Sequence, residues 1–389
     1  MNDLESNLWK FNLIAVLEGF VLYYAFDKIL MQVRDLSITQ IVMVEIAFTI
    51  TAISLEVPSG ALADKWERRK VLALNSVFFM LNTLFWAIGH NFYIFLIGGI
   101  FAGVHVALLS GTFTSLVYDT LKQIGNEESY DRIWGRIASY EAGSLVIASI
   151  LGSMIADRFG ITIPLWLTLI FSAAATLIAL MLEEPKIHRQ SEDTKYWEHI
   201  KITFQYLWKH PTLYHLIALM AILGGTVDLV HEYAQLYFVK VGISLFFLGY
   251  LTALGSGIES IGTRFSYLFS RFQRRNVYAF FILLSSLGFV LTGYFNSRLG
   301  AIFPFLTLLA FYSALPLMLS DLHRELPSTY RATGESFTAF AGQAFYLPAA
   351  FGFGYFADRL SIATAYMGVG VLLMVYFLVY ALGSYRFIR

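Results

Sequence analysis

Four ionisable side chains lie well inside apolar stretches of the sequence: Glu18, His105, Asp228 and Glu259. A charge in hydrocarbon costs about 2.5–3.5 kcal/mol on insertion scales, so such a residue needs either a partner or a function. Carboxylates and imidazoles can bind protons and cations at this depth. We predict a substrate- or proton-binding role for them. The alternative for Glu18 is a neutral carboxyl group hydrogen-bonded to another helix. For His105 it is a packing residue, and for Glu259 a polar seam between helices.

A polar stripe follows one of these stretches. Asp228, His231, Glu232 and Gln235 stand at positions i, i+3, i+4 and i+7, which places them on one face of a helix. His231 can change its charge near neutral pH. The stripe therefore predicts a proton site, and the alternative is that it forms the polar wall of an outer vestibule.

Aromatic side chains accompany the acidic ones. Tyr23 and Tyr24 follow Glu18 a little over one helical turn later, and Tyr312 lies in another apolar stretch. Aromatic faces attract cations, and neighbouring carboxylates add to that attraction. The predicted pocket thus favours amphipathic cations over sugars or phosphates.

The composition shows which elements position these residues. The chain has 389 residues, of which 57% are hydrophobic and only 14% charged, too few to cover a water-soluble globule. A spanning helix needs about 20 apolar residues. Twelve such runs predict transmembrane helices at 9–31, 38–62, 71–89, 92–118, 133–156, 161–182, 211–238, 244–268, 277–295, 299–321, 331–356 and 361–385.

One long polar segment divides these runs into six and six. Residues 1–182 and 211–389 are predicted to form two bundles, and 183–210 a cytoplasmic linker. Apolar and basic residues alternate in the linker, which predicts an amphipathic helix on the membrane surface or an ordinary linker. The two halves also repeat short motifs, since residues 156–159 read ADRF and residues 357–360 read ADRL. Related halves around a midplane site are typical of transporters.

Charge distribution sets the expected orientation. Only six of the 27 Lys and Arg residues fall in one set of loops: Lys28, Arg34, Arg158, Lys240, Arg298 and Arg359. Because basic residues gather in short cytoplasmic loops, both termini are predicted to be cytoplasmic. Cysteine is absent, which excludes disulfides and Cys-ligated metals. Neither a cofactor nor a metal is predicted, and the zero net charge gives no sign of a nucleic-acid partner.

The first charged loop carries a recognisable motif. Gly60, Asp64, Arg68, Arg69 and Lys70 stand in the order that resembles the loop signature between helices two and three of the major facilitator superfamily. The match is incomplete, because that family usually has a second Gly where this chain has Glu67. An Arg common in proton-coupled members is Gly99 here.

The resemblance implies a cytoplasmic gate. In it Asp64 would meet the start of the eleventh helix, near residues 331–335, and Arg68 would pair with Asp119. Arg69 and Arg136 are assigned to the same gate. The alternative is that these charges only satisfy the positive-inside rule.

These features together predict an all-α membrane protein with twelve transmembrane helices in two pseudo-symmetric six-helix bundles. The arrangement of Glu18, Tyr23 and Tyr24 resembles that in multidrug facilitators. We expect a bacterial cell-membrane protein, monomeric and not an enzyme, that exports a small apolar or cationic molecule in exchange for protons by alternating access. The alternatives are proton-coupled uptake of a small nutrient or organic acid, and a non-transporting membrane sensor.

Overall fold

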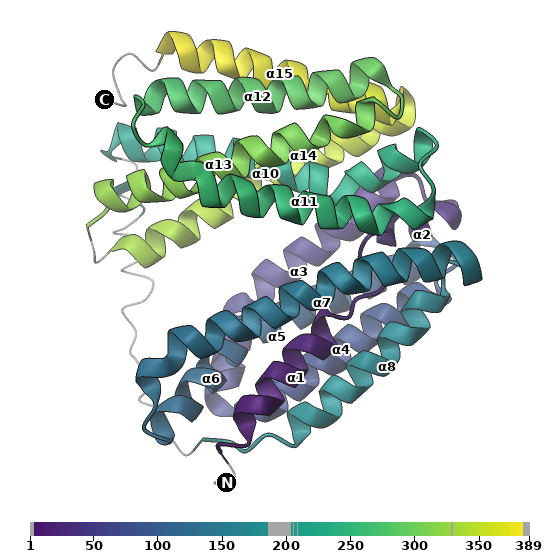
Figure 1. The fold of residues 1–389 in the computed structure, drawn as a ribbon, viewed down its shortest axis with the longest axis vertical. Coiled ribbons are helices and arrows are strands. Elements are labelled where there is room, and N and C mark those ends of the chain that lie inside the picture. Colours follow the sequence, from purple (N-terminus) through teal and green to yellow (C-terminus); the bar gives the residue numbers. More distant parts are fainter. Residues whose placement is uncertain (1–3, 186–203, 205, 208, 328–329, 384–389) are drawn as a thin grey trace. The chain divides into compact units, whose positions relative to one another are not determined.

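The protein is helical throughout the part of the chain that the computed structural model describes, residues 4–185, 204, 206–207, 209–327 and 330–383. No strand occurs in these residues, so the predicted all-α architecture is confirmed. The elements, drawn in Figure 1, are α1 (Asn7–Gly19), α2 (Asp27–Val33), α3 (Ile38–Lys65), α4 (Arg68–Ile88), α5 (Phe92–Leu109), α6 (Thr112–Gln123), η1 (Glu127–Ser129), α7 (Tyr130–Phe159), α8 (Ile163–Leu180), α10 (Pro211–Lys240), α11 (Leu245–Phe265), η2 (Ser266–Phe269), α12 (Arg274–Phe295), η3 (Gly300–Ile302), α13 (Pro304–Glu325), α14 (Arg331–Arg359) and α15 (Ile362–Gly383).

The helices belong to two compact units. The first comprises Met1–Ser191 and Ser244–Ala253, and the second comprises Glu192–Ile243 and Leu254–Arg389. Their internal packing is repeated. Helix α4 packs on α8 as α12 packs on α15, and α1 packs on α7 as α10 packs on α14. The predicted amphipathic helix lies mostly outside the described residues.

Ten helical segments of the described chain are long and apolar enough to cross a bilayer. Two of the twelve predicted spans are not among these ten segments. The run 9–31 is interrupted between α1 and α2, and α14 is polar in its first half. The run 92–118 is not one continuous helix either, because Gly111, with φ 72°, separates α5 from α6.

The interruption of the first run is held by neighbouring helices. The Leu22 N–H donates to Thr168 Oγ1 of α8 over 3.1 Å. On the other side α7 approaches so closely that a Cβ added to Gly152 would lie 1.6 Å from the Leu22 carbonyl oxygen. Irregular backbone at membrane depth is tolerated only where protein groups or water satisfy it. Interrupted helices of this kind form the ion and substrate sites of many transporters.

The charged loop after the predicted run 38–62 is shorter than the motif at residues 60–70 suggested. Helix α3 continues through Pro58 as far as Lys65, and the turn to α4 consists of Trp66 and Glu67 alone. Proline is tolerated inside a spanning helix when neighbouring helices and hydroxyl side chains support it. Here Ser59 Oγ donates to the Ala107 carbonyl of α5 over 2.7 Å.

Candidate functional site

Glu18 lies in the last turn of α1 and is bound by side chains of α4. Ser76 Oγ donates to Glu18 Oε1 over 2.8 Å, and Asn75 Nδ2 donates to the same oxygen over 3.3 Å. Charge-assisted hydrogen bonds of this kind offset part of the cost of placing a carboxylate among apolar helices. Asn75 and Ser76 were not predicted, although two adjacent polar residues inside the apolar run 71–89 were a usable signal.

Glu18 faces a cavity of about 390 Å³ within the first unit. Two carboxylates and an imidazole share this cavity with aromatic and aliphatic side chains. The lining residues are Glu18, Gly19, Val21, Tyr24, Phe79, His105, Leu109, Ala138, Glu141, Ala142 and Leu145. Such a volume accommodates a small organic molecule. Its acidic and aromatic walls suit a cation.

His105 is held by two contacts. Its Nδ1 lies 3.3 Å from the Asn75 carbonyl oxygen, which requires the proton on Nδ1 for a hydrogen bond. Its ring packs against Phe79 with the ring centroids 4.9 Å apart. Asn75 thereby connects His105 to Glu18 through its backbone and its side chain.

Gly19 brings α7 to the same place. A Cβ on Gly19 would lie 2.6 Å from the Glu141 carbonyl oxygen and 2.9 Å from Ser144 Cβ, so only glycine permits this approach of α1 and α7. The close contact places Glu141 beside Glu18 in the cavity wall.

The two tyrosines after Glu18 have different positions. Tyr24 lines the cavity, as predicted. Tyr23 does not. It is 3% exposed, and its hydroxyl lies 3.2 Å from Asn82 Oδ1 and 3.0 Å from Thr83 Oγ1 of α4. The interruption after Gly19 rotates the two side chains away from the positions that an unbroken helix would give them.

Lys28 was assigned to an outer loop, and that assignment is wrong. Its side chain is 3% exposed, its Nζ lies 2.7 Å from Asp27 Oδ2, and it forms a second ion pair with Glu45 of α3. The interruption of the first run turns α2 back into the bundle and buries this residue.

In the second unit His231 meets residues of two other helices. Its Nε2 lies 3.4 Å from Glu259 Oε1 of α11 and 3.4 Å from the Tyr312 hydroxyl of α13. Three predicted site residues are therefore brought together. A protonated Nε2 donates to Glu259, whereas an unprotonated Nε2 accepts from Tyr312, so the cluster has a distinct arrangement for each state.

The other members of the α10 stripe surround this cluster. Asp228 is half-buried one turn before His231, near enough to interact with the charges of His231 and Glu232. Gln235 is buried, and its Nε2 donates to the Glu232 carbonyl over 3.4 Å. Along the stripe Gln235 is thus buried and Asp228 is half-buried, whereas His231 is exposed.

The turn between α3 and α4 contains the predicted Arg68–Asp119 ion pair. Glu184, which follows α8, accepts hydrogen bonds from the backbone N–H groups of Arg68 and Arg69, both over 2.9 Å. A carboxylate at a helix N-terminus is favoured by the helix dipole and by the unpaired N–H groups there. The ends of α4, α6 and α8 are therefore joined at this turn.

Glu67 completes this turn. Its carboxylate accepts hydrogen bonds from Lys70 and Arg69, both over 2.7 Å, and the pKa of Glu67 is lowered by these two contacts.

The structure shows little about the gate role predicted for Gly60, Arg136 and Asp64. Gly60 lies within α3, with no neighbouring atom within 4 Å of an added Cβ, and Arg136 is exposed on α7. The backbone of Asp64 belongs to the last turn of α3, but its side chain lies outside what the structure describes.

The second unit repeats the first ion pair. Arg274, the first residue of α12, lies 3.1 Å from Asp321 Oδ2, and the Tyr278 hydroxyl donates to the same oxygen over 2.5 Å. Asp321 lies near the end of α13, as Asp119 lies near the end of α6. The next arginine, Arg275, donates to the Ala381 carbonyl of α15 over 2.9 Å. Corresponding contacts at corresponding places support an internal duplication.

Comparison with known proteins agrees with this architecture. The sequence model of the Major Facilitator Superfamily matches residues 11–344. The uncharacterized transporter BU466 of Buchnera aphidicola is 25% identical over 131 residues, a segment that covers 34% of this chain and 32% of that relative. The match therefore spans about a third of the relative's length.

Solved structures share the fold over nearly the whole chain. The nucleoside transporter NupG superposes with a TM-score of 0.72 at 16% identity, covering 98% of each chain. A D-xylose-proton symporter gives 0.66 at 15% identity, with 98% of each chain covered. A POT family transporter in complex with a thioalcohol-conjugated peptide gives 0.72 at 10% identity, covering 97% of this chain and 96% of that one. At such identities the likeness concerns the fold.

Proposed function

The chain belongs to the Major Facilitator Superfamily, a family of membrane transporters, and on that premise we propose that it exports a small apolar or cationic molecule in exchange for protons. The cavity at Glu18 carries this proposal. There a carboxylate held by Ser76 and Asn75 shares about 390 Å³ with Glu141 and with aromatic side chains. An organic cation in this cavity would be attracted by the carboxylates and by the ring faces.

Exchange follows from competition for one carboxylate. A proton on Glu18 removes the charge that attracts the cation, and a bound cation favours release of the proton. Alternating exposure of the cavity to the two membrane faces then couples the two movements.

Asn75 can form a hydrogen bond with Glu18 when Glu18 is protonated as well as when it is ionised. Its Oδ1 is buried and has no hydrogen-bond partner among the described residues. When Glu18 is ionised, the amide nitrogen donates to it. When Glu18 is protonated, rotation of the amide presents Oδ1 as the acceptor for the new O–H group. Both states of Glu18 can therefore be satisfied without moving a helix.

A second proton site is proposed in the other unit, at His231, Glu259 and Tyr312. When both ring nitrogens of His231 are protonated, Nε2 donates to Glu259; when His231 is neutral with its proton on Nδ1, Nε2 accepts from Tyr312. Asp228 lies one helical turn from His231, and protons enter and leave the His231 cluster through its carboxylate.

Transport into proteoliposomes tests the proposal. The full chain is reconstituted, the membrane potential is clamped with valinomycin and equal potassium, and uptake of tetraphenylphosphonium is followed. An acidic interior should drive accumulation, and Glu18→Gln should reduce the rate at least about tenfold. Asp228→Asn should also reduce it, while Glu128→Gln, an exposed carboxylate on η1, serves as the control.

Two outcomes would count against this function. Accumulation driven by an acidic exterior would indicate proton-coupled uptake instead. Gradient-driven movement that survives both Glu18→Gln and Asp228→Asn would remove the assigned sites.

A further inference from the structure

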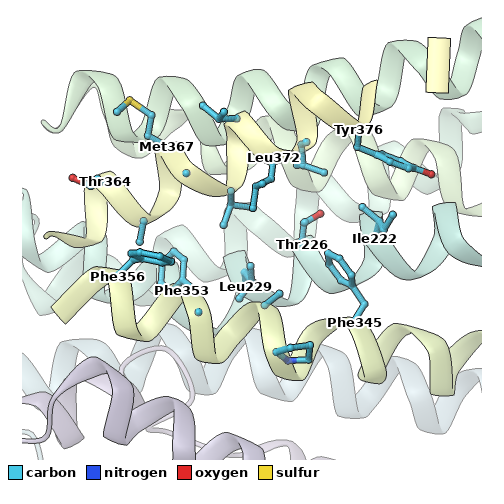
Figure 2. Close-up of a pocket in the computed structure, with 18 of the residues that line it drawn as sticks. Ile222, Thr226, Leu229, Phe345, Phe353, Phe356, Thr364, Met367, Leu372 and Tyr376 are labelled. Carbon is cyan, nitrogen blue, oxygen red and sulfur yellow. The ribbon is translucent and has the colours of Figure 1, made fainter. Parts of the chain in front are cut away.

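The second unit contains a larger cavity that is separate from the His231 cluster. It has a volume of about 790 Å³ and lies between α10, α14 and α15, as Figure 2 shows. Representative lining residues are Thr226, Phe345, Gly352, Phe356, Thr364 and Leu372. We call this cavity the α14–α15 slot.

The slot offers almost no polar group to a ligand. None of the described residues that line it is charged. Thr226 Oγ1 already donates to the Leu223 carbonyl over 2.8 Å, and Thr364 Oγ1 is bonded to Ser361 Oγ over 2.9 Å, so the Tyr376 hydroxyl is the remaining side-chain hydroxyl of the lining. A cavity lined so sparsely by polar groups accepts apolar molecules.

The slot is long rather than round. Its lining extends from Phe345 to Phe356 on α14 and from Thr364 to Tyr376 on α15, and Leu360 lies in the turn between the two helices. At 1.5 Å per residue the two helical stretches are about 16 Å and about 18 Å long. Gly352 and Gly368 create the space, since a Cβ on either would meet no atom within 4 Å. An extended hydrocarbon chain fits such a shape.

One side of the slot opens onto the outer surface of the helices. Leu372 is 70% exposed and Phe356 is 54% exposed, whereas Leu229 and Phe353 on the inner side are buried. Leu372 lies in the middle of α15, one of the segments able to span a bilayer, and an exposed apolar side chain there faces the hydrocarbon of the bilayer. Lipid chains therefore have direct access to the slot.

A basic residue stands at the end of the slot. Arg359 directly precedes the lining residue Leu360, at the turn between α14 and α15. It is exposed, its guanidinium lies 5.5 Å from the Tyr355 ring centroid, and it has no ion pair within the described part of the chain. A guanidinium at the end of a span is suited to a phosphate group.

We propose that the α14–α15 slot is a binding site for an anionic glycerophospholipid, with one acyl chain along the slot and the phosphate at Arg359. The long dry cavity selects the chain, and the exposed arginine selects the charged headgroup. The site would fix a lipid to the pair of helices that packs against α10, the helix carrying Asp228 and His231.

Native mass spectrometry of the full chain, delipidated and titrated with phosphatidylglycerol, tests this site. Gly352→Phe should fill the slot and weaken the tightest lipid-binding step at least about tenfold. Gly342→Phe is the matched control, because Gly342 lies on the same helix in equally open space but outside the slot. Gly352→Leu replaces Gly352→Phe if the larger side chain impairs folding.

The headgroup is tested separately. Arg359→Gln should weaken phosphatidylglycerol binding about fivefold and leave phosphatidylcholine binding nearly unchanged. Arg158→Gln, the counterpart in the first unit, should leave the binding of both lipids nearly unchanged. Equal affinities of the parent protein and the Gly352 variants would overturn the proposal, as would inorganic phosphate competing fully with the lipid.

Discussion

At the scale of single residues, the behaviour of Glu18 depends on donors from α4. Ser76 and Asn75 both reach the same carboxylate oxygen, and Asn75 also contacts His105 through its carbonyl group. The carboxylate is therefore oriented by side chains of another helix, which can change when the helices move. A positioning role for Ser76 follows from this geometry.

Ser76→Ala should slow tetraphenylphosphonium transport about three- to tenfold, because a charge-assisted hydrogen bond to Glu18 is lost. The same change in a Glu18→Gln background should have little further effect, since both substitutions act on one interaction. Ser172→Ala, which removes a buried hydroxyl bonded only within α8, is the control. Additive effects in the double variant would contradict the proposed positioning role.

The acidic residues of the site could be predicted from the sequence, because a carboxylate inside an apolar run is conspicuous. Their partners could not. Ser76 and Asn75 are compatible with any face of a spanning helix, and only the packing of α1 on α4 makes them donors to Glu18. The burial of Lys28 was missed for the same reason, since it depends on where the first run is interrupted.

At the scale of elements, the interruption between α1 and α2 decides which side chains reach the cavity. It places Tyr24 in the cavity wall and Tyr23 outside the cavity, and it buries Lys28. Helices α7 and α8 support it. Hydropathy cannot reveal such an interruption, because its residues are as apolar as those of a helix. Gly152 is the residue on which the support from α7 depends.

Gly152→Ala should destabilise the purified protein by about 1–3 kcal/mol, because the new Cβ would collide with the backbone at Leu22. Gly143→Ala, nine residues earlier on α7, meets no neighbouring atom and should be neutral or stabilising by about 0.5–1 kcal/mol. Thermal unfolding in detergent measures both. Similar melting temperatures for the two variants would show that α7 is not pressed against the interruption.

At the scale of the whole molecule, the two units repeat one design. The ion pairs Arg68–Asp119 and Arg274–Asp321 occupy corresponding places, and corresponding helices pack together. The sequence predicted the repeat from short motifs, and the number of runs was sufficient for the fold class. It could not predict which helices are interrupted, because that depends on contacts between helices.

The proposed cytoplasmic gate belongs to this scale. We expect Asp64→Asn to slow turnover at least about tenfold while tetraphenylphosphonium affinity changes less than about threefold, because a gate acts on the movement between states. Glu56→Gln, an exposed carboxylate on the same helix, should leave both unchanged. Equal rates in the Asp64 variant and the parent would refute the gate.

A proton and a cation are proposed to compete for Glu18. Calorimetric titration with tetraphenylphosphonium, in buffers of different ionisation enthalpy, counts the protons released on binding. We expect release of about one proton per cation at mildly acidic pH in the parent protein, and markedly less in Glu18→Gln. Cation binding by the parent without proton release, or with the same release in Glu18→Gln, would contradict it.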